Sequence, residues 1–493
     1  MKRSAGALAW LAGVLLGAAT ILPAEAATAT ATATAPPGTC RLPGLSHAVQ
    51  CGAVQRPLDP ARPAATPIDI HYVVVPALAR RKRPDPVFLL AGGPGQSAID
   101  LAPNVMPLFS RLNNRRDIVF VDQRGTGRSA PLDCGDARAE PIAAQADPQR
   151  QVDRLTACLE RLRRLPHGDT RYYTTEIAVR DLDAVRAALG APQINLVGAS
   201  YGTRVALEYQ RQFPQAVRRS VLDGAAPADM DLVASLAVDS ARALEAMFAA
   251  CEAEAACVAR YPHLRRDWLA LLASLPRSIA VEHPLSGAVE HFNLSREMLL
   301  GLVRGPLYAP AWAAALPTAI DAAVRGDFRA LMGVGSLLES RRGTRLAMGM
   351  HLSVVCAEDR ATLGRSGLLP PELVDAGANL YRELCRIWPR GDVSAGFYSF
   401  DTARTPVLLL SGGLDPATPP RHADRLARAL GPLARQGVVP NAGHGAMGLP
   451  CLRDVMFRFI DAEEAGDAAQ VSADCAAAVP RPLAFLPMRR DAP

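Results

Sequence analysis

A serine between two glycines stands in the stretch "NLVGASYGTR", residues 195–204. Its core, "GASYG", is a G-x-S-x-G motif, which is typical of a serine held on a sharp turn between a strand and a helix. A serine hydroxyl is a poor nucleophile near neutral pH until a base removes its proton, and that base needs a carboxylate to orient it. Ser200 could therefore attack an ester or amide carbonyl if the chain also supplies a histidine and an acid.

A candidate acid and a candidate base follow Ser200 along the chain. Asp415 lies in "LLLSGGLDPATPP" and His444 in "VVPNAGHG", each after an apolar run. The order Ser, Asp, His is one of those in which serine hydrolases arrange a triad. Asp223, in "VLDGAAP", is the alternative acid, but the glycine-rich loop and the later strand favour Asp415. The other eight histidines lack this setting, and we interpret His351 as structural.

Two backbone N–H groups must bind the negative charge that develops on the carbonyl oxygen during attack. The residue after the nucleophile, Tyr201, is expected to supply one of them. The second is expected from "LLAGGPG", residues 89–95, because glycines let the backbone approach a substrate closely. We assign Gly93 as this donor, with Gly92 as the alternative; the same loop would also make a tight turn.

The elements that must position these residues alternate between strand-like and helical patterns, which is typical of a parallel α/β sheet. We expect strands at 68–75, 87–91, 117–121, 194–197, 219–222, 406–410 and 436–439. Apolar residues at helical spacing predict a crossover helix at 174–189, and a second helix at 204–212 follows the serine. Ser200, Asp415 and His444 thus each come after a predicted strand.

The strand pattern stops between residues 225 and 394, where alanine- and leucine-rich helical segments replace it. We interpret 225–394 as an inserted helical lid. The core is then split in sequence into a first part, 40–224, and a second part, 395–493, which ends in a closing segment.

The N-terminal residues are typical of an export signal. A basic start, "MKR", precedes an apolar stretch, and "AEA" at 24–26 has the small-x-small pattern of a signal peptidase site. We expect a signal peptide at 1–26 and a low-complexity linker at 27–39. An uncleaved membrane anchor is the alternative, which the short apolar run disfavours. The protein is expected in the periplasm or outside the cell, without stable membrane association once the signal is cleaved.

Export changes how the ten cysteines are interpreted, since paired structural disulfides are the default in an oxidising compartment. Taken in order along the chain, they group as Cys40 with Cys51, Cys134 with Cys158, Cys251 with Cys257, Cys356 with Cys385 and Cys451 with Cys475. Sequence alone does not determine connectivity. A zinc site is disfavoured, because no Cys-x-x-Cys occurs and no histidine has zinc-finger spacing.

Composition excludes some classes of partner. The chain has 493 residues, 49% of them hydrophobic and 21% charged, which is a globular balance. A net charge of +6 is small for this length, and the arginines are scattered among acids, so nucleic-acid binding is not indicated.

Several stretches together resemble the exported tripeptidyl aminopeptidase and proline iminopeptidase group of α/β-hydrolases. The resemblance rests on "AGGPG", "VFVDQRGTGRS", "TTEIAVRDLDAVRAALG", "NLVGASYGTRVALEY", "VLDGAAP", "LSGGLDPATPP" and "NAGHG". The late stretch that begins "PCLRDVMFRFI" is similar to the C-terminal segment of the tripeptidyl-peptidase branch. Proline iminopeptidases usually show His-Gly-Gly-Pro-Gly, and Ala91 replaces that histidine here. The resemblance implies an α/β-hydrolase fold with a mostly parallel central sheet flanked by helices and an inserted helical lid.

The resemblance also implies substrates with a free N-terminus, whose ammonium group would pair with an acidic side chain. "SVVCAEDR", residues 353–360, matches a Cys-x-acidic motif of this branch. Glu358 is therefore the candidate ammonium anchor and Asp359 the second candidate. A structural role for Glu358, as a cap or salt bridge beside Cys356, stays open. The implied acyl-transfer mechanism requires no cofactor and no metal.

These observations together predict an exported serine hydrolase, an aminopeptidase that releases N-terminal residues or tripeptides from peptides. A carboxylesterase or lipase that uses the same triad on small esters is the alternative. Epoxide hydrolases and dehalogenases need a carboxylate nucleophile, which a serine at position 200 disfavours. A non-catalytic binding protein on the same scaffold is disfavoured because the full set of residues stands in order.

Overall fold

The computed structural model of the chain describes residues 32–33, 37–283, 286–337, 345–359 and 376–487. These residues belong to the unit that Ala31–Pro493 form. The predicted signal peptide, 1–26, lies outside the described residues, and so does most of the predicted linker.

A central sheet follows the strand order β1-β3-β4-β6-β5-β7-β8-β11-β12, with β2 paired to β3. Its strands are β1 (Thr32–Ala33), β2 (Gly38–Cys40), β3 (Val49–Pro57), β4 (Pro67–Val75), β5 (Val87–Leu90), β6 (Ile118–Val121), β7 (Ile194–Ala199), β8 (Val217–Asp223), β11 (Val407–Gly412) and β12 (Ala434–Val439). Pairing is parallel from β6 to β12 and antiparallel at β3 and β4. The prediction of a mostly parallel α/β sheet is therefore confirmed.

All the strands predicted from sequence lie in this sheet, and their ends differ from the prediction by at most two residues. Most of them were recognisable because strands buried on both faces are continuous apolar runs; all of β5, "VFLL", is buried, whereas β4 and β12 also contain exposed residues. β3 was not predicted. Its nine residues, "VQCGAVQRP", include only two buried ones, so it lacks such a run.

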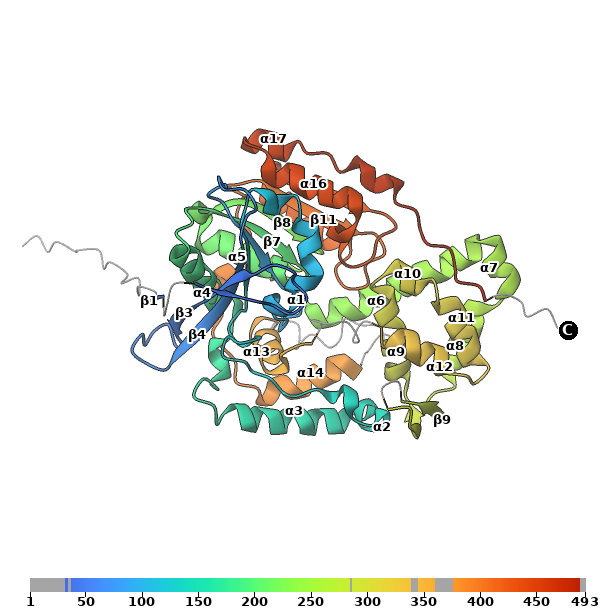
Figure 1. Cartoon of the computed structure of the whole chain (residues 1–493). Helices are drawn as coiled ribbons and strands as arrows, with labels where there is room; N and C mark the ends of the chain where they lie inside the picture. The colour runs from blue at the N-terminus through green and yellow to red at the C-terminus, as the bar shows by residue number, and fades with distance from the viewer. Residues whose placement is uncertain (1–31, 34–36, 284–285, 338–344, 360–375, 488–493) are drawn as a thin grey trace, which may run out of the picture. The chain divides into compact units, whose positions relative to one another are not determined.

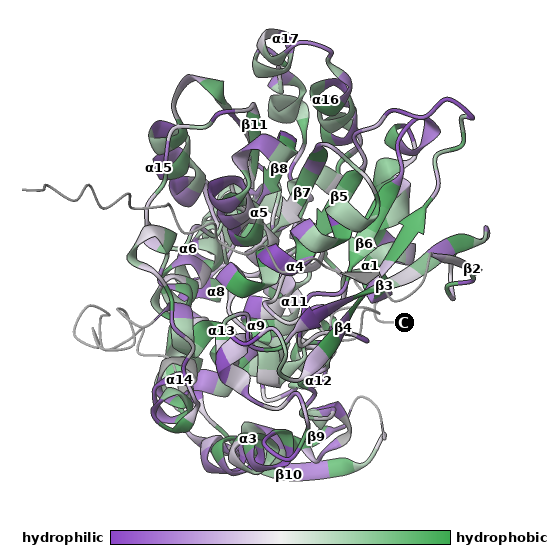
Figure 2. Ribbon diagram, turned by 90° about the vertical axis from the view of Figure 1, so that its left-hand side faces the viewer, coloured by the Kyte–Doolittle hydropathy of each residue, from purple (hydrophilic) through white to green (hydrophobic). Residues whose placement is uncertain are grey.

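Helices connect the strands and cover both faces of the sheet. They are α1 (Ala98–Val105), α2 (Ile142–Ala146), α3 (Pro148–Leu162), α4 (Thr175–Ala188), α5 (Tyr201–Gln212), α15 (Pro420–Leu430), α16 (Pro450–Asp461) and α17 (Ala465–Ala469). Alternate side chains of β5 point to opposite faces: Phe88 and Leu90 belong to a core cluster with α4 and α5, whereas Val87 and Leu89 belong to one with α1 and α16. Figure 2 shows β5 and β6 as hydrophobic ribbon within this arrangement.

The segment between β8 and β11 contains most of the remaining elements. They are α6 (Leu232–Ala253), α7 (Ala255–Arg260), α8 (Leu264–Ala273), β9 (Arg277–Glu282), β10 (Val289–Leu294), α9 (Arg296–Leu307), α10 (Pro310–Ala313), α11 (Leu316–Val324), α12 (Arg329–Gly335), α13 (Met348–Glu358) and α14 (Ala376–Ile387). An antiparallel hairpin, β9–β10, thus accompanies the helices expected there.

This segment packs in two ways. Elements α6 to α12, together with Ile142 of α2, form a separate core cluster, which includes Phe248, Trp268 and Leu299. By contrast, α13 contributes Met350 and Leu352 to the cluster on the sheet. The part of the segment nearest the sheet therefore packs as core, and the rest packs largely on itself.

The C-terminal segment after α17 runs to the helices of the segment between β8 and β11, which we call the insertion (Figure 1). The backbone N–H of Phe485 donates to the Ala314 carbonyl at 2.7 Å, and the Arg481 guanidinium donates to the Ala246 carbonyl at 3.0 Å. This segment therefore connects the C-terminal part of the core to α6 and the turn after α10.

Five disulfides join the described cysteines, in the pairing obtained by taking the cysteines in order. Such a set is typical of proteins that work outside the cytoplasm. Among the described helices, none combines the length and the apolar character that crossing a membrane requires.

Candidate active site

Ser200 stands at the turn between β7 and α5, as the G-x-S-x-G motif predicts. Its backbone has φ 55° and ψ −123°, a conformation that costs a non-glycine residue about 1–3 kcal/mol. A Cβ on Gly198 would lie 2.4 Å from the Gly202 carbonyl oxygen, and a Cβ on Gly202 would lie 2.1 Å from that of Leu90. Glycine is required at both positions because the start of α5 packs directly on β7 and β5.

The glycine loop after β5 lies beside the serine. A Cβ on Gly92 would be 3.3 Å from Ser200 Cβ, a tight contact that glycine avoids. Gly93 and Gly95 have φ of 109° and 105°, in the left-handed region that favours glycine. The loop is therefore placed where its backbone can face a substrate bound at Ser200. The choice between Gly93 and Gly92 as oxyanion donor stays a prediction, as does Tyr201.

Helix α13 holds this loop from the other side. The backbone N–H of Ala347 donates to the Gly95 carbonyl at 2.9 Å. The His351 ring is buried, with Nδ1 3.0 Å from the Pro94 carbonyl oxygen and Nε2 2.7 Å from the Tyr381 hydroxyl. Because a carbonyl only accepts hydrogen bonds, Nδ1 carries the proton and Nε2 accepts from Tyr381. Sequence reasoning set His351 aside as structural, and no sequence pattern indicated this contact.

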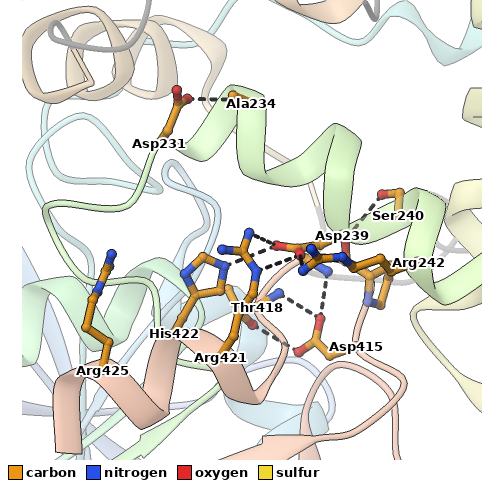
Figure 3. A network of polar contacts seen from close by, with 12 residues as sticks. Asp231, Ala234, Asp239, Ser240, Arg242, Asp415, Thr418, Arg421, His422 and Arg425 are labelled. Carbon is orange, nitrogen blue, oxygen red and sulfur yellow. Dashed lines mark hydrogen bonds and ion pairs between the residues drawn. The ribbon is translucent and has the colours of Figure 1, made fainter. Parts of the chain in front are cut away.

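His444 and Asp415 form a hydrogen-bonded pair at 2.8 Å between Nδ1 and Oδ2. The Asp415 carboxylate is fully buried and also accepts the N–H groups of Ala417 and Thr418, at 2.7 and 2.9 Å, and the Thr418 hydroxyl at 2.9 Å. Figure 3 shows Asp415 beside Thr418 at the start of α15. These contacts hold the carboxylate in one orientation, so that it fixes the plane of the ring.

The electrostatics of this pair favour an ionised acid. Burial alone would raise the pKa of Asp415, but the charge of His444 and the hydrogen bonds from its neighbours hold it below its usual value. Burial lowers the pKa of His444, while the Asp415 carboxylate and, to a smaller extent, Asp223 raise it by more, so the net shift is upward. An imidazole with an ionised partner on Nδ1 can take a proton on Nε2.

Ser200 and His444 are both held by the end of β8. The Ser200 N–H donates to the Asp223 carbonyl at 2.9 Å, and a Cβ on the next residue, Gly224, would lie 3.2 Å from His444 Cε1. In the part of the chain that the structure describes, no hydrogen bond joins the Ser200 hydroxyl to the His444 ring. Such bonds are often long before a substrate binds.

The alternative acid, Asp223, does not contact Nδ1 of His444. Its buried carboxylate accepts the backbone N–H groups of Ala446 and Met447, at 3.0 and 2.9 Å. Asp415 therefore occupies the position from which an acid orients the imidazole.

The side chains of Glu358 and Asp359 contact helix α5 near its start, and Glu358 also contacts the start of α4. The Glu358 carboxylate accepts the Thr175 N–H at 2.7 Å and the Arg204 guanidinium at 3.2 Å, and Asp359 also accepts from Arg204 at 3.2 Å. All three charged side chains are at most 1% exposed. Burial raises the pKa of Glu358 and raises that of Asp359 to about 7. These contacts are with residues that support the turn at Ser200 between β7 and α5, which we call the elbow. They do not involve Ser200 or His444.

Two family models match the chain. Residues 85–259 match the α/β hydrolase fold, and residues 372–469 match TAP-like protein. Tripeptidyl aminopeptidase of Streptomyces lividans is 29% identical over 452 residues, 83% of this chain and 81% of the relative. Serine protease Hip1 of Mycobacterium tuberculosis is 30% identical over 37% of this chain and 36% of its own length. Carboxylesterase B of the same species is 28% identical over 36% of each chain.

Proposed function

The chain belongs to the α/β-hydrolases and carries a TAP-like segment in its C-terminal part, and on this premise we propose that it is an exported serine aminopeptidase. It would release N-terminal residues or tripeptides from peptides. The observation that carries the proposal is the His444–Asp415 pair, joined through β8 to a serine on a strained elbow. The extent of similarity to a tripeptidyl aminopeptidase supports the substrate class.

In the proposed mechanism, Ser200 Oγ attacks the scissile carbonyl carbon while His444 Nε2 takes the hydroxyl proton. Asp415 holds the ring and stabilises the imidazolium. The N–H groups of Tyr201 and Gly93 bind the oxyanion. As the C–N bond breaks, His444 returns the proton to the leaving amine. His444 then takes a proton from water as the water oxygen attacks the acyl carbon, and it returns this proton to Ser200 Oγ as the acyl C–O bond breaks and the acid leaves.

The ammonium anchor is proposed to be the buried acidic pair, Glu358 first and Asp359 second. Both carboxylates accept hydrogen bonds from Arg204, which lies on α5 one helical turn after Ser200. If the pair binds the substrate ammonium, Glu358→Gln and Asp359→Asn raise KM for free-amine substrates and leave N-acetylated ones unchanged. If it serves only to hold Arg204, turnover of both kinds of substrate falls in parallel with thermal stability.

The function is tested by kcat/KM of the mature protein on aminoacyl, prolyl and tripeptidyl p-nitroanilides, each with a free and an acetylated N-terminus, and on p-nitrophenyl butyrate. We expect preference for free-amine amides and loss of turnover in Ser200→Ala. Ester turnover that is indifferent to acetylation would instead indicate a carboxylesterase, which the similarity to Carboxylesterase B keeps as second candidate.

The proposed cellular site is the periplasm or the exterior, after cleavage near residue 26 and without stable membrane association. The five disulfides support it, because they need an oxidising compartment. We propose further that 225–394 acts as the lid over the site. N-terminal sequencing of the protein from periplasmic and culture fractions tests cleavage and location.

A further inference from the structure

Asp223, the last residue of β8, is a buried carboxylate that the proposed mechanism does not use. It is 2% exposed, and the hydrogen bonds to its carboxylate come from the backbone N–H groups of Ala446 and Met447. Burying a carboxylate costs free energy unless its environment stabilises the charge. The residue therefore calls for a role beyond filling space.

The backbone carbonyl and the side-chain carboxylate of Asp223 contact two different segments of the proposed catalytic site. The backbone carbonyl accepts the N–H of Ser200 at 2.9 Å. The side-chain carboxylate accepts the N–H groups of Ala446 and Met447, two and three residues after His444. One residue thus joins the nucleophile elbow to the loop that carries the base.

The neighbouring residue completes this junction. Gly224 has φ 68°, and a Cβ there would lie 2.7 Å from Thr418 Oγ1 and 3.2 Å from His444 Cε1. Thr418 in turn donates to Asp415. The dipeptide at the end of β8 therefore contacts the segments of all three proposed catalytic residues, and β8 is an inner strand, paired to β7 and to β11.

We propose that Asp223 is a positioning residue, whose carboxylate fixes the His444 loop against the Ser200 elbow and places a second negative charge beside the imidazole. This inference rests on the proposed function of Ser200 and His444.

The groups that face His444 are Asp415 on Nδ1, Asp223, Thr418 and the edge-on ring of Tyr308, whose centroid is 5.2 Å away. Two carboxylates thus interact electrostatically with one imidazole, and both favour its protonated form. The charge of Asp223 would stabilise the imidazolium that forms as Ser200 attacks. Because burial raises the pKa of Asp223 itself to about 6, this contribution fades as the pH falls through that value.

The test compares Asp223→Asn with Asp122→Asn. Asp122 is the matched control: it is 1% exposed, directly follows β6, another inner strand of the same sheet, and accepts two backbone N–H groups and the Ser97 hydroxyl. Both changes remove a buried carboxylate, so both are expected to lower the melting temperature. Only Asp223→Asn is expected to lower kcat on tripeptidyl amides, by roughly 10- to 100-fold with KM nearly unchanged.

The pH dependence of kcat/KM distinguishes a positioning role of Asp223 from a role in folding stability alone. Neutral His444 is the active form, and a nearby carboxylate raises its pKa, so removing the Asp223 charge moves the acidic limb of kcat/KM to lower pH. Asp122→Asn leaves that limb where it is. If Asp223→Asn keeps the wild-type limb and loses no more activity than Asp122→Asn, the proposal is wrong. Should Asp223→Asn not fold, Asp223→Ser, which can still accept one hydrogen bond, carries the same expectation.

A second readout makes this test independent of the substrate. The rate at which a fluorophosphonate labels Ser200 depends on neutral His444, whatever peptide or ester the enzyme prefers. If peptide turnover is absent but the labelling rate shows the same shift in Asp223→Asn, the proposed aminopeptidase function fails and the role of Asp223 stands.

Discussion

At the scale of single residues, the proposed nucleophile, Ser200, stands on a strained turn, and the proposed base, His444, is hydrogen-bonded to a buried carboxylate. The serine is held at φ 55° by close packing that admits only glycine at positions 198 and 202. His444 is oriented by a carboxylate whose own pKa is held down by its neighbours. The side chain of His444 is 18% exposed, so a substrate can reach it, whereas the side chain of Asp415 is inaccessible to solvent.

Replacing the acid tests the orientation of the base. Asp415→Asn keeps the shape but favours the wrong imidazole tautomer, so kcat is expected to fall about 10⁴-fold, the size seen for this change in a Ser-His-Asp triad. Thr418→Val removes only one of the hydrogen bonds to Asp415 and is expected to cost far less. Steady-state kinetics on one tripeptidyl amide measure both. Equal effects of the two variants would contradict the assignment.

The pH profile tests the charge on His444. The base must be neutral to accept the serine proton, and the Asp415 and Asp223 carboxylates together raise its pKa above the usual 6.5 in spite of burial. The activity kcat/KM is therefore expected to fall as the pH drops through a value above 6.5. A profile that stays flat down to pH 5 would show that no such base limits the reaction.

The support of the glycine loop gives a prediction at His351. His351→Leu removes the donor to the Pro94 carbonyl, so the loop loses a fixed position and kcat is expected to fall roughly 10- to 100-fold. His351→Asn keeps an N–H near Nδ1 and should retain most activity. The measurement is kcat for amides and esters alike, with melting temperatures as the control for folding. Equal loss in both variants would contradict a positioning role.

At the scale of elements, helix α6 is joined to the helix that follows the proposed catalytic acid, Asp415. The buried Asp239 carboxylate accepts from Arg421 at 2.9 and 2.8 Å and from His422 at 3.1 Å, both in the first turn of α15 (Figure 3). The next residue, Ser240, donates to the Pro416 carbonyl at 3.2 Å. The insertion therefore contacts the loop that contains Asp415.

This link predicts an effect of α6 on catalysis. Asp239→Asn weakens the pairing, so kcat is expected to fall several-fold and hydrogen exchange in α15 to quicken. Asp229→Asn is the matched control, since Asp229 pairs with Arg425 of the same helix, but at the surface, where ion pairs contribute little. Kinetics and exchange that match between the two variants would rule out the link.

Sequence analysis predicted the elements that are apolar throughout and the motifs whose residues lie close together in the chain. It missed β3 and the β9–β10 hairpin, because their strands expose much of their surface and show no apolar run. Contacts such as Asp239 with Arg421 join residues 182 positions apart, and no local pattern predicts them. For the same reason the partner of Glu358, Arg204, was not foreseen.

At the scale of the whole molecule, disulfides lie in the core, in the insertion and in the C-terminal segment. One of them, Cys356–Cys385, joins α13, which holds the glycine loop, to α14. Their contribution to stability is expected to depend on the length of chain that each one closes.

That dependence can be measured. Removing Cys356–Cys385, with a separation of 29 residues, is expected to cost about 3.5 kcal/mol, and removing Cys251–Cys257, with a separation of 6, about 2 kcal/mol. Urea unfolding of the two double serine variants compares them. The reverse order would show that local packing, rather than chain entropy, determines their effect.

The proposal as a whole depends on Ser200 being the nucleophile that His444 activates. Its most direct test is intact-mass measurement after treatment with a fluorophosphonate, on the wild type, Ser200→Ala and His444→Ala. We expect a single adduct, mapped to Ser200, in the wild type, none in Ser200→Ala and labelling slowed by orders of magnitude in His444→Ala. An adduct on another residue, or one that forms as fast without His444, would contradict it.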